Sequence, residues 1–505
     1  MGSKCKNADR GSDNQTTETN LPFSRKICYA IGGAPYHMTG NALAFFLQIF
    51  FLDVVHMEAS YVSVILFTGR AWDAITDPFV GYLVSKSKKT RFGKLIPWAV
   101  FTMPFGVCAY ILLWFSLPDS VNSGLKFFWH FMMYCLFQTF MTCYHVPYTA
   151  LNMFLGGNQK ERDSATAYRM AVEMFGTLAG CVIQGQIVGV YHAKTAQKCS
   201  EQNFTVFNSS STLAESVIAM RKAYIVAAVL LGGFYFICAI ILLVGVKEQA
   251  GVLTPLGQSK LHFFSGLRCV ITHKAYLRLI CGFLFSSLAF QMAQGNFALF
   301  STHAAGLGHS FQHLVVIMLV AATLSVPIWQ LLLGRFGKKT ILFVGLSCYI
   351  PVLAIIAASK SSFILFAILG SLAGASLASL YLIPWSMLPD VIDDFKVKNP
   401  NCMDLEPIFY SCYVFFNKFG GGIAQGSSNL ILHFAGYKPG ACVQEARVVT
   451  SLKILFAPIP IGLLLLGLLM FYFYPINEER RKELKAQLEQ IRKEKETHED
   501  KDTVI

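Results

Sequence analysis

Long apolar segments separated by short polar ones run along almost the whole chain. A helix that crosses a membrane needs about 20 mostly apolar residues, and twelve segments of roughly that length can be delimited in the sequence. The pattern predicts an all-α integral membrane protein with twelve transmembrane helices. The predicted spans are residues 27–52, 61–84, 95–117, 127–155, 165–190, 222–246, 276–303, 311–333, 341–358, 362–388, 407–432 and 451–474.

The composition agrees with this pattern. Hydrophobic residues make up 54% of the 505 residues and charged residues only 14%, whereas soluble proteins carry about 25% charged residues. So few charges cannot cover the surface of a water-soluble particle, which excludes a soluble enzyme, a disordered chain and a nucleic-acid binder despite the net charge of +13. Because residues 1–26 are polar, no cleavable signal peptide is expected and the first apolar segment is a retained span.

The basic residues indicate how the spans are oriented. An even number of spans places both termini on one side of the membrane. The segments on that side carry 29 Lys and Arg, against 9 in the opposite segments. Cytoplasmic segments carry the excess of basic residues, so both termini are expected in the cytoplasm.

Two short motifs occur twice. The sequence RFGK stands at residues 91–94 and 335–338, while VPYTAL at 146–151 is matched by IPWSML at 383–388. The offsets of 244 and 237 residues are similar, and each pair is six spans apart. Transporters of the major facilitator fold consist of such six-span repeats, with the site at mid-membrane between them. We therefore expect two six-helix pseudo-symmetric halves, divided as a tail (1–26), a first half (27–246), a cytoplasmic linker (247–275), a second half (276–474) and a second tail (475–505).

The second span carries three charged residues, Arg70, Asp73 and Asp77. Spacings of three and four residues place them on one helical face, and ionisable groups within spans usually face a polar cavity. Two carboxylates one turn apart repel each other unless a cation lies between them, and the Thr76 hydroxyl adds an oxygen of the kind that hard cations bind. The favoured interpretation is a site for a monovalent cation or a proton. The alternative is a structural ion pair between Arg70 and Asp73.

The eleventh span contains Lys418, close to three consecutive glycines at 420–422 that allow another helix or a ligand to approach. The lysine lies roughly 16 Å from either end of its span at 1.5 Å per residue, which is too far for its side chain to reach water. A counter-charge must therefore come from inside the bundle. The aspartates of the second span are the expected partners.

The fifth span carries Arg169 and Glu173, four residues apart. This pair is formally neutral and could be purely structural. Alternatively, the planar guanidinium of Arg169 could bind an anionic oxygen of a substrate. His37 and His145 remain open between a hydrogen-bonded structural role and a role as ligands.

The charged motifs also carry a family resemblance. The pattern DxxTDP at 73–78, together with Thr142 and Lys418, resembles the sodium-coupled melibiose-permease group of major facilitator proteins. From about residue 26 to residue 481, the chain more closely resembles the vertebrate family of sodium-dependent lysophosphatidylcholine symporters. The stretches that carry this resemblance are GGAPY at 32–36, GRAWD at 69–73, ERDSATAYRM at 161–170 and PWSMLPD at 384–390.

The resemblance implies sodium-coupled transport of a lysophospholipid across the plasma membrane, with the endoplasmic reticulum as a second location. It implies a sodium site at Asp73 and Asp77, with Thr76 and Thr142 as oxygen donors. Sodium is then a co-transported ion, and no other cofactor is expected. The partners are the lysophospholipid, sodium and membrane lipids, and the protein is expected to be a monomer.

The resemblance also implies a substrate site. Lys418 and Arg169 are expected to meet the phosphate of the headgroup, with Trp385 lining the pocket and Arg70 and Glu173 nearby. Glutamines stand where the family is expected to have glutamates, which leaves the headgroup specificity open. These two departures from the family pattern are Gln138 and Gln294.

Other functions fit the sequence less well. The related carriers of sphingosine-1-phosphate resemble the chain over the same length but lack the first aspartate of the second span, which is present here as Asp73. They remain the alternative. An integral membrane enzyme is not favoured because neither a GxSxG nor an Hx4D motif occurs, and a receptor is not favoured because of the six-plus-six repeat.

The predicted extracellular segments contain two candidate modifications. Only two of the fourteen cysteines, Cys199 and Cys442, fall in these segments, one in each half. Disulfides persist outside the cell, so we expect these two cysteines to be bridged. Asn203 and Asn208 begin acceptor sequons in the same loop as Cys199, so glycosylation is expected at one or both.

We predict that Cys199 and Cys442 are protected from alkylation in the non-reduced protein and become reactive after reduction. The measurement is mass spectrometry of alkylated peptides from protein at the cell surface. Two thiols that react without reduction would contradict the bridge.

Overall fold

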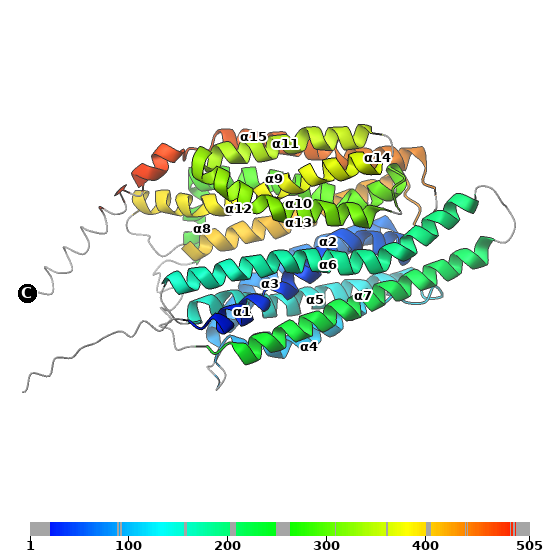
Figure 1. Ribbon diagram of the computed structural model, residues 1–505, viewed down its shortest axis with the longest axis horizontal. Coiled ribbons are helices and arrows are strands. Elements are labelled where there is room, and N and C mark those ends of the chain that lie inside the picture. Colours follow the sequence, from blue (N-terminus) through cyan, green and yellow to red (C-terminus); the bar gives the residue numbers. More distant parts are fainter. Residues whose placement is uncertain are drawn as a thin grey trace, which may run out of the picture.

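A computed structural model of the chain describes residues 21–490, with gaps at 88–89, 91–92, 156–158, 203–208, 249–262, 309, 360–361, 400–405, 440, 442, 485 and 488–489. The described residues form helices joined by turns and loops, with one isolated bridge between Thr90 and Gly93. The helices lie side by side along the long axis of the molecule (Figure 1). This arrangement confirms the all-α fold.

The helices follow in two groups, one for each half of the chain. The first group is α1 (Phe23–Ile31), α2 (Ala34–Ile49), the π-helical turn η1 (Phe50–Val54), α3 (Ala59–Lys86), α4 (Ile96–Leu113), α5 (Ser123–Ala150), the 3-10 turn η2 (Leu151–Phe154), α6 (Gln159–Gln202) and α7 (Ser209–Gly245). The second group is α8 (Phe263–Thr272), α9 (Lys274–Leu299), the π-helical turn η3 (Phe300–Ala304), α10 (Phe311–Phe336), α11 (Lys338–Ala358), α12 (Phe363–Lys398), α13 (Glu406–Ala435), α14 (Ala446–Phe456) and α15 (Pro458–Tyr472).

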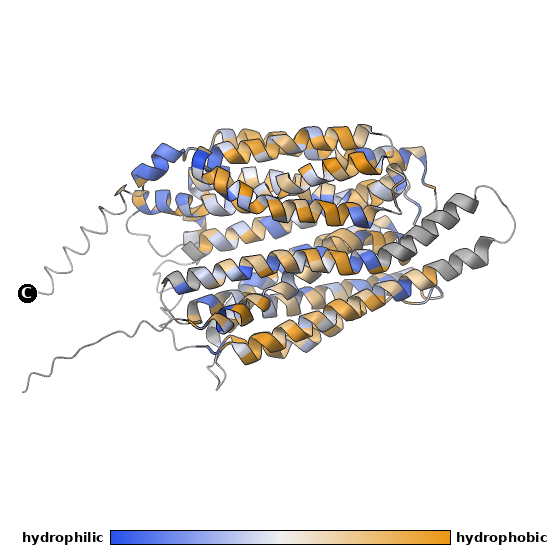
Figure 2. Cartoon of the chain, viewed as in Figure 1, coloured by the Kyte–Doolittle hydropathy of each residue, from blue (hydrophilic) through white to orange (hydrophobic). Residues whose placement is uncertain are grey.

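These elements correspond to the twelve predicted spans. Within the described residues, eight helical segments are long and apolar enough to cross a membrane. The four remaining spans are α3, α5, α6 and α13, which carry Asp73, Thr142, Arg169 and Lys418 respectively. Hydrophobic residues dominate along the helices, and hydrophilic residues gather near their ends (Figure 2). The spans with the least apolar sequences are therefore those that carry the charged and hydroxyl residues of the predicted site, whereas Trp385 lies on the apolar α12.

The helices differ from the predicted spans in their ends and breaks. Helix α12 continues to Lys398, ten residues beyond its predicted span, because its polar final turns remain helical after the apolar pattern stops. The last span is broken at Ala457 into α14 and α15. Pro458, the first residue of α15, has no backbone N–H to continue the ladder of α14, so the helix restarts there.

The two halves pack against each other along three helix pairs. Helix α3 contacts α13, α6 contacts α10, and α2 contacts α9. The glycine of the repeated motif RFGK has a positive φ in each half, +108° at Gly93 and +79° at Gly337. A left-handed backbone of this kind favours glycine. The motif glycine thus adopts a left-handed φ in both halves, in agreement with two pseudo-symmetric halves.

The bundle has two ends, which differ in the segments that lie there. We call the end at which α1 begins and the helical residues 478–484 lie the terminal end. The π-helical turns η1 and η3 lie at the opposite end. The residues of the predicted disulfide and glycosylation sites fall outside the described residues, except that Cys199 lies in a helical stretch of α6 whose side chains are not described. Those two modifications remain predictions.

Candidate functional site

A buried ion-pair cluster joins the two halves at the contact between α3 and α13. The ammonium nitrogen of Lys418 lies 3.0 Å from Oδ1 of Asp73 and 2.6 Å from Oδ2 of Asp77. The side chains of Lys418 and Asp73 are only 8% and 6% exposed. The structure thus brings together the three charged residues for which the sequence predicted contact.

The close approach of α3 and α13 depends on the glycines after Lys418. A Cβ atom added to Gly422 would lie 3.0 Å from Cβ of Arg70 and 3.1 Å from the backbone oxygen of Phe67. These distances are shorter than ordinary van der Waals contact. The absence of a side chain at Gly422 therefore lets the α13 backbone come near α3, where Lys418 can reach both carboxylates.

Two threonines supply oxygen atoms beside the aspartates. The hydroxyl of Thr142 on α5 donates to Oδ1 of Asp73 at 3.1 Å. The hydroxyl of Thr76 donates to the backbone oxygen of Asp73 at 3.0 Å and lies 3.5 Å from the Thr142 hydroxyl. Carboxylate and hydroxyl oxygens are ligands that hard cations prefer. The Lys418 ammonium thus lies among oxygen atoms that could instead hold a small cation.

Arg70 does not act as the ion-pair partner of Asp73, which was the alternative interpretation of the second span. Asp73 pairs with Lys418, and among the described residues no ion pair joins Asp73 to Arg70. The buried Nε of Arg70 has no hydrogen-bond partner. The guanidinium therefore has a donor left for a ligand.

A second charged cluster lies in the first half around Glu173. Its carboxylate lies 3.3 Å from Nε of Arg169 and 3.5 Å from Nε2 of His37. A further nitrogen of Arg169 donates to the hydroxyl of Tyr29 at 3.4 Å. The side chains of Arg169 and Glu173 are 19% and 14% exposed. The predicted pair is present, and His37 joins it.

Tyr36 lies between the two clusters, a position that the sequence did not predict. Its ring stacks on His145 with centroids 3.8 Å apart and contacts the ring of the neighbouring His37 at 5.3 Å. The ammonium of Lys418 lies 6.0 Å from the same ring, within the range of cation–π attraction. The only signal in the sequence was that Tyr36 belongs to the GGAPY stretch that carried the family resemblance.

Trp385 belongs to a separate aromatic group in the second half. Its ring meets that of Tyr413 at 4.8 Å and that of Tyr410 at 6.3 Å, and the residue is 39% exposed. No contact within the described residues joins it to Lys418 or Arg169. The structure therefore does not group Trp385 with the two charged clusters, although its exposed ring is free to meet a ligand.

The two glutamines that depart from the family pattern lie apart from each other. Gln138 is buried on α5, the helix that also carries Thr142. Gln294 on α9 lines a small cavity in the second half whose other walls are mostly apolar, among them Phe290 and Tyr349. Neither glutamine has a described contact with the lysine or with the aspartates that pair with it.

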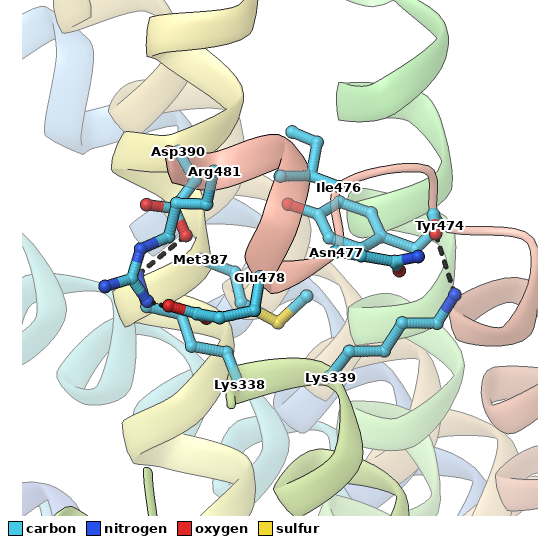
Figure 3. Close-up of a pocket in the computed structure, with 9 residues that line it drawn as sticks. All are labelled: Lys338, Lys339, Met387, Asp390, Tyr474, Ile476, Asn477, Glu478 and Arg481. Atoms are coloured by element: carbon cyan, nitrogen blue, oxygen red, sulfur yellow. Dashed lines mark hydrogen bonds and ion pairs between the residues drawn. The ribbon is translucent and has the colours of Figure 1, made fainter. Parts of the chain in front are cut away.

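A third charged cluster lies at the terminal end of the second half (Figure 3). The ammonium of Lys338 lies 2.7 Å from Asp390, and that of Lys339 lies 2.8 Å from the backbone oxygen of Tyr474. Glu478 and Arg481 form another pair at 3.0 Å. These side chains fill the pocket with their own contacts, so we interpret it as the junction that holds the residues after α15 against the bundle.

Removing the charge of Lys418 should destabilise the protein strongly. We predict that Lys418→Met lowers the thermal stability of the purified protein, because the buried carboxylate of Asp73 and the partly buried one of Asp77 are left without their cation, and losing one partner of a buried pair costs about 3–5 kcal/mol. Thermal unfolding in detergent without sodium measures the effect. The matched control is Lys438→Met, which removes an exposed pair with Glu445 and should leave the unfolding temperature unchanged. Equal unfolding temperatures for Lys418→Met and the native chain would contradict the prediction.

The sequence and fold are similar to those of known transporters. A family profile described as MFS/sugar transport protein matches residues 28–478. The chain is 48% identical to the sodium-dependent lysophosphatidylcholine symporter 1 of Gallus gallus, over 96% of this chain and 92% of that protein. It is 47% identical to the protein of the same name from Homo sapiens, over 94% and 89%. A sphingosine-1-phosphate transporter of Xenopus tropicalis is 44% identical over 95% and 93%.

Solved structures show the same fold at much lower sequence identity. A bacterial homologue of the human lysosomal transporter Spinster has a TM-score of 0.61 and 11% identity, over 89% of this chain and 94% of its own. The nucleoside transporter NupG has a TM-score of 0.59 and 11% identity, over 90% and 100%. With two six-helix halves, the buried charges between them and a family match over nearly its whole length, this chain belongs to the MFS/sugar transport proteins of the major facilitator superfamily.

Proposed function

We propose that the protein is a sodium-coupled symporter of lysophosphatidylcholine. The observation that carries this proposal is the ammonium of Lys418 between Asp73 and Asp77, in a chain 48% identical to a protein named for that activity. The proposal includes a plasma-membrane location, cytoplasmic termini and a monomeric protein. The terminal end of the bundle is then cytoplasmic, as is the linker at 247–275, and the opposite end is extracellular.

Sodium would bind in place of the Lys418 ammonium. The carboxylates of Asp73 and Asp77 carry two negative charges, and Lys418 neutralises one of them. A sodium ion that takes the position between the carboxylates finds the hydroxyls of Thr76 and Thr142 beside Asp73. Oxygen donors from two helices, α3 and α5, would therefore hold the ion.

The lysophospholipid headgroup would bind between the two charged clusters. Its phosphate pairs with Lys418 and Arg169, with Arg70 as a further donor and Glu173 positioning Arg169. The trimethylammonium group would rest on the exposed face of Trp385, because aromatic faces attract quaternary ammonium groups. The lipid chain would remain among the apolar surfaces of the bundle.

A carrier of sphingosine-1-phosphate is the second candidate, because a transporter of that lipid is 44% identical to the chain. Both lipids offer a phosphate to Lys418 and Arg169, so the basic residues do not separate them. Lysophosphatidylcholine has a quaternary ammonium group, whereas sphingosine-1-phosphate has a primary amine close to its phosphate. Competition between the two lipids in one uptake assay distinguishes the candidates.

We predict that cells expressing the protein take up labelled lysophosphatidylcholine in sodium medium and that uptake falls to background when potassium replaces sodium. Asp77→Asn should abolish the sodium-dependent part, because the one remaining carboxylate, on Asp73, cannot offset both Lys418 and a desolvated sodium ion. Uptake normalised to the amount of protein at the surface measures both effects.

The matched control for this experiment is Asp119→Asn. Asp119 lies between α4 and α5 and pairs with Arg221, away from the cation site, so its uptake should equal that of the native chain. Uptake by Asp77→Asn with an unchanged sodium dependence would place the cation site elsewhere. Uptake of sphingosine-1-phosphate alone would favour the second candidate.

We further predict that sodium raises the affinity for the lipid. When sodium binds the carboxylates, Lys418 loses its partners and becomes available to the phosphate. Linkage requires the lipid to raise the sodium affinity by the same factor. Lipid binding to purified protein, with and without sodium, tests this coupling. Lys418→Ala should lose the sodium effect and Lys418→Arg should recover it only in part, because the guanidinium geometry differs; equal affinities in both conditions for the native chain would contradict the scheme.

A further inference from the structure

Two π-helical turns occupy equivalent positions in the two halves. In η1 the backbone N–H of Val55 donates to the oxygen of Phe50 at 3.0 Å, and in η3 the N–H of Ala305 donates to the oxygen of Phe300 at 2.9 Å. The turns begin 250 residues apart, each at the end of the first long helix of its half. π-Turns inside helices are rare and occur frequently at functional sites.

The fourth residue of each turn is polar, and the two side chains meet across the interface. Asp53 occupies this position in η1 and His303 in η3. Nε2 of His303 lies 3.1 Å from Oδ2 of Asp53, and these side chains are only 7% and 14% exposed. An interaction between pseudo-equivalent residues therefore joins the halves at the end opposite the termini.

A third residue completes this contact. The hydroxyl of Tyr437 donates to Oδ1 of Asp53 and lies 3.2 Å from Nε2 of His303. The backbone N–H of Tyr437 bonds to the oxygen of Leu432, and that of Gly436 to the oxygen of His433, which is the pattern of a Schellman turn. The end of α13 thus fixes Tyr437 beside the two other side chains.

Buried polar contacts continue from this group toward Lys418. The amide of Gln48 donates to Oδ1 of Asn296 at 3.3 Å, and the Asn296 amide donates to the hydroxyl of Ser428 at 2.9 Å. Nearby, the Ser63 hydroxyl donates to the backbone oxygen of Gly426 at 2.6 Å. The contacts from Gln48 and from Ser63 join one half to the other, and the side chains involved are buried.

This part of the interface is not fully satisfied. The side-chain oxygens of Gln48 and Asn429 are buried without a hydrogen-bond partner. An unpaired buried acceptor loses its hydration without compensation. Water would satisfy both groups if the halves separated here, so the polar lining favours opening as soon as the contacts at the end of the bundle are broken.

We propose that Asp53, His303 and Tyr437 form a latch that closes the extracellular end of the transport path. The three residues are positioning residues, because they hold the halves together without contacting the cation site. Opening the latch exposes Gln48, Asn296 and Ser428 and gives sodium and the headgroup access to Lys418. The assignment of this end to the outside rests on the proposed function.

The latch can be tested with a cysteine placed behind it. Ser428→Cys introduces a thiol that is buried between the latch and Lys418 in the closed state. A charged, membrane-impermeant thiol reagent is added outside intact cells. The labelling rate is compared with that of the chain that keeps Ser428, which gives the background from the native cysteines. Adding Asp53→Asn should raise the labelling rate of the introduced thiol about tenfold or more, the effect expected from losing a charge-assisted hydrogen bond.

Two controls make the result specific. The first is Asp119→Asn, which removes an ion pair with Arg221 that lies at the same end of the bundle but within one half. The hydrogen bond from Arg221 lowers the pKa of Asp119. This control therefore removes a charged carboxylate, as Asp53→Asn does. Its labelling rate should equal that of the native latch. The exchange of Asp53→His with His303→Asp restores an acid–base pair at pseudo-equivalent positions and should return the labelling to the slow rate.

A further variant tests the latch if Asp53→Asn does not reach the cell surface. Tyr437→Phe removes one hydroxyl from the latch and should also accelerate labelling. Equal rates for Asp53→Asn, Tyr437→Phe and the native latch would overturn the inference, as would an exchanged pair that labels as fast as Asp53→Asn.

Lipid uptake, measured in the same cells, separates this inference from the proposed function. If the native chain takes up no lysophosphatidylcholine but the latch variants label faster, the proposed substrate is wrong and the latch is still supported. Normal sodium-dependent uptake with unchanged labelling refutes the latch alone.

Discussion

The burial of one ammonium group in the membrane constrains the rest of the structure. Lys418 is too deep to reach water, so a partner must neutralise it inside the bundle. Asp73 and Asp77 meet that requirement from the other half of the molecule. The approach of α3 to α13, with a glycine at the closest point, and the hydroxyl groups around Asp73 all follow from the need to accommodate this cluster.

The two halves share a backbone but divide the chemistry unequally. The positive φ of the RFGK glycine and the π-helical turns recur in both halves. The first half supplies the aspartates and the Arg169–Glu173 pair, whereas the second supplies a single buried lysine opposite them. Because Lys418 lies on one half and its carboxylate partners on the other, the groups that we propose bind ligands also hold the halves together. In the proposed function, binding at these groups would therefore change the electrostatic contact between the halves directly.

Much of this arrangement could be predicted from the sequence. The apolar segments indicated the helices, the repeated motifs indicated the halves, and the depth of Lys418 required contact with Asp73 or Asp77. The position of Tyr36 could not be predicted, because it depends on how the fold places His145 of α5 and Lys418 of α13 around its ring. The π-turns were also hidden, since a one-residue change in hydrogen bonding leaves the apolar pattern unaltered. Trp385 was expected to line the substrate pocket; its contacts with Tyr410 and Tyr413 could not be predicted, and its role in the pocket stays a prediction.

The pairing of Asp73 with Lys418 also has a consequence for how the chain enters the membrane during synthesis. The two residues are 345 positions apart, so α3 is made and inserted long before its partner exists. Until α13 arrives, its carboxylates lie in the bilayer without Lys418, and an unpaired charge there is unfavourable by about 2.5–3.5 kcal/mol even on the mildest scales. The carboxyl groups of α3 therefore lack this partner until synthesis is nearly finished. A chain that stops before α13 would keep exposed acidic groups in the bilayer, a feature by which cellular quality control could distinguish it from the complete protein.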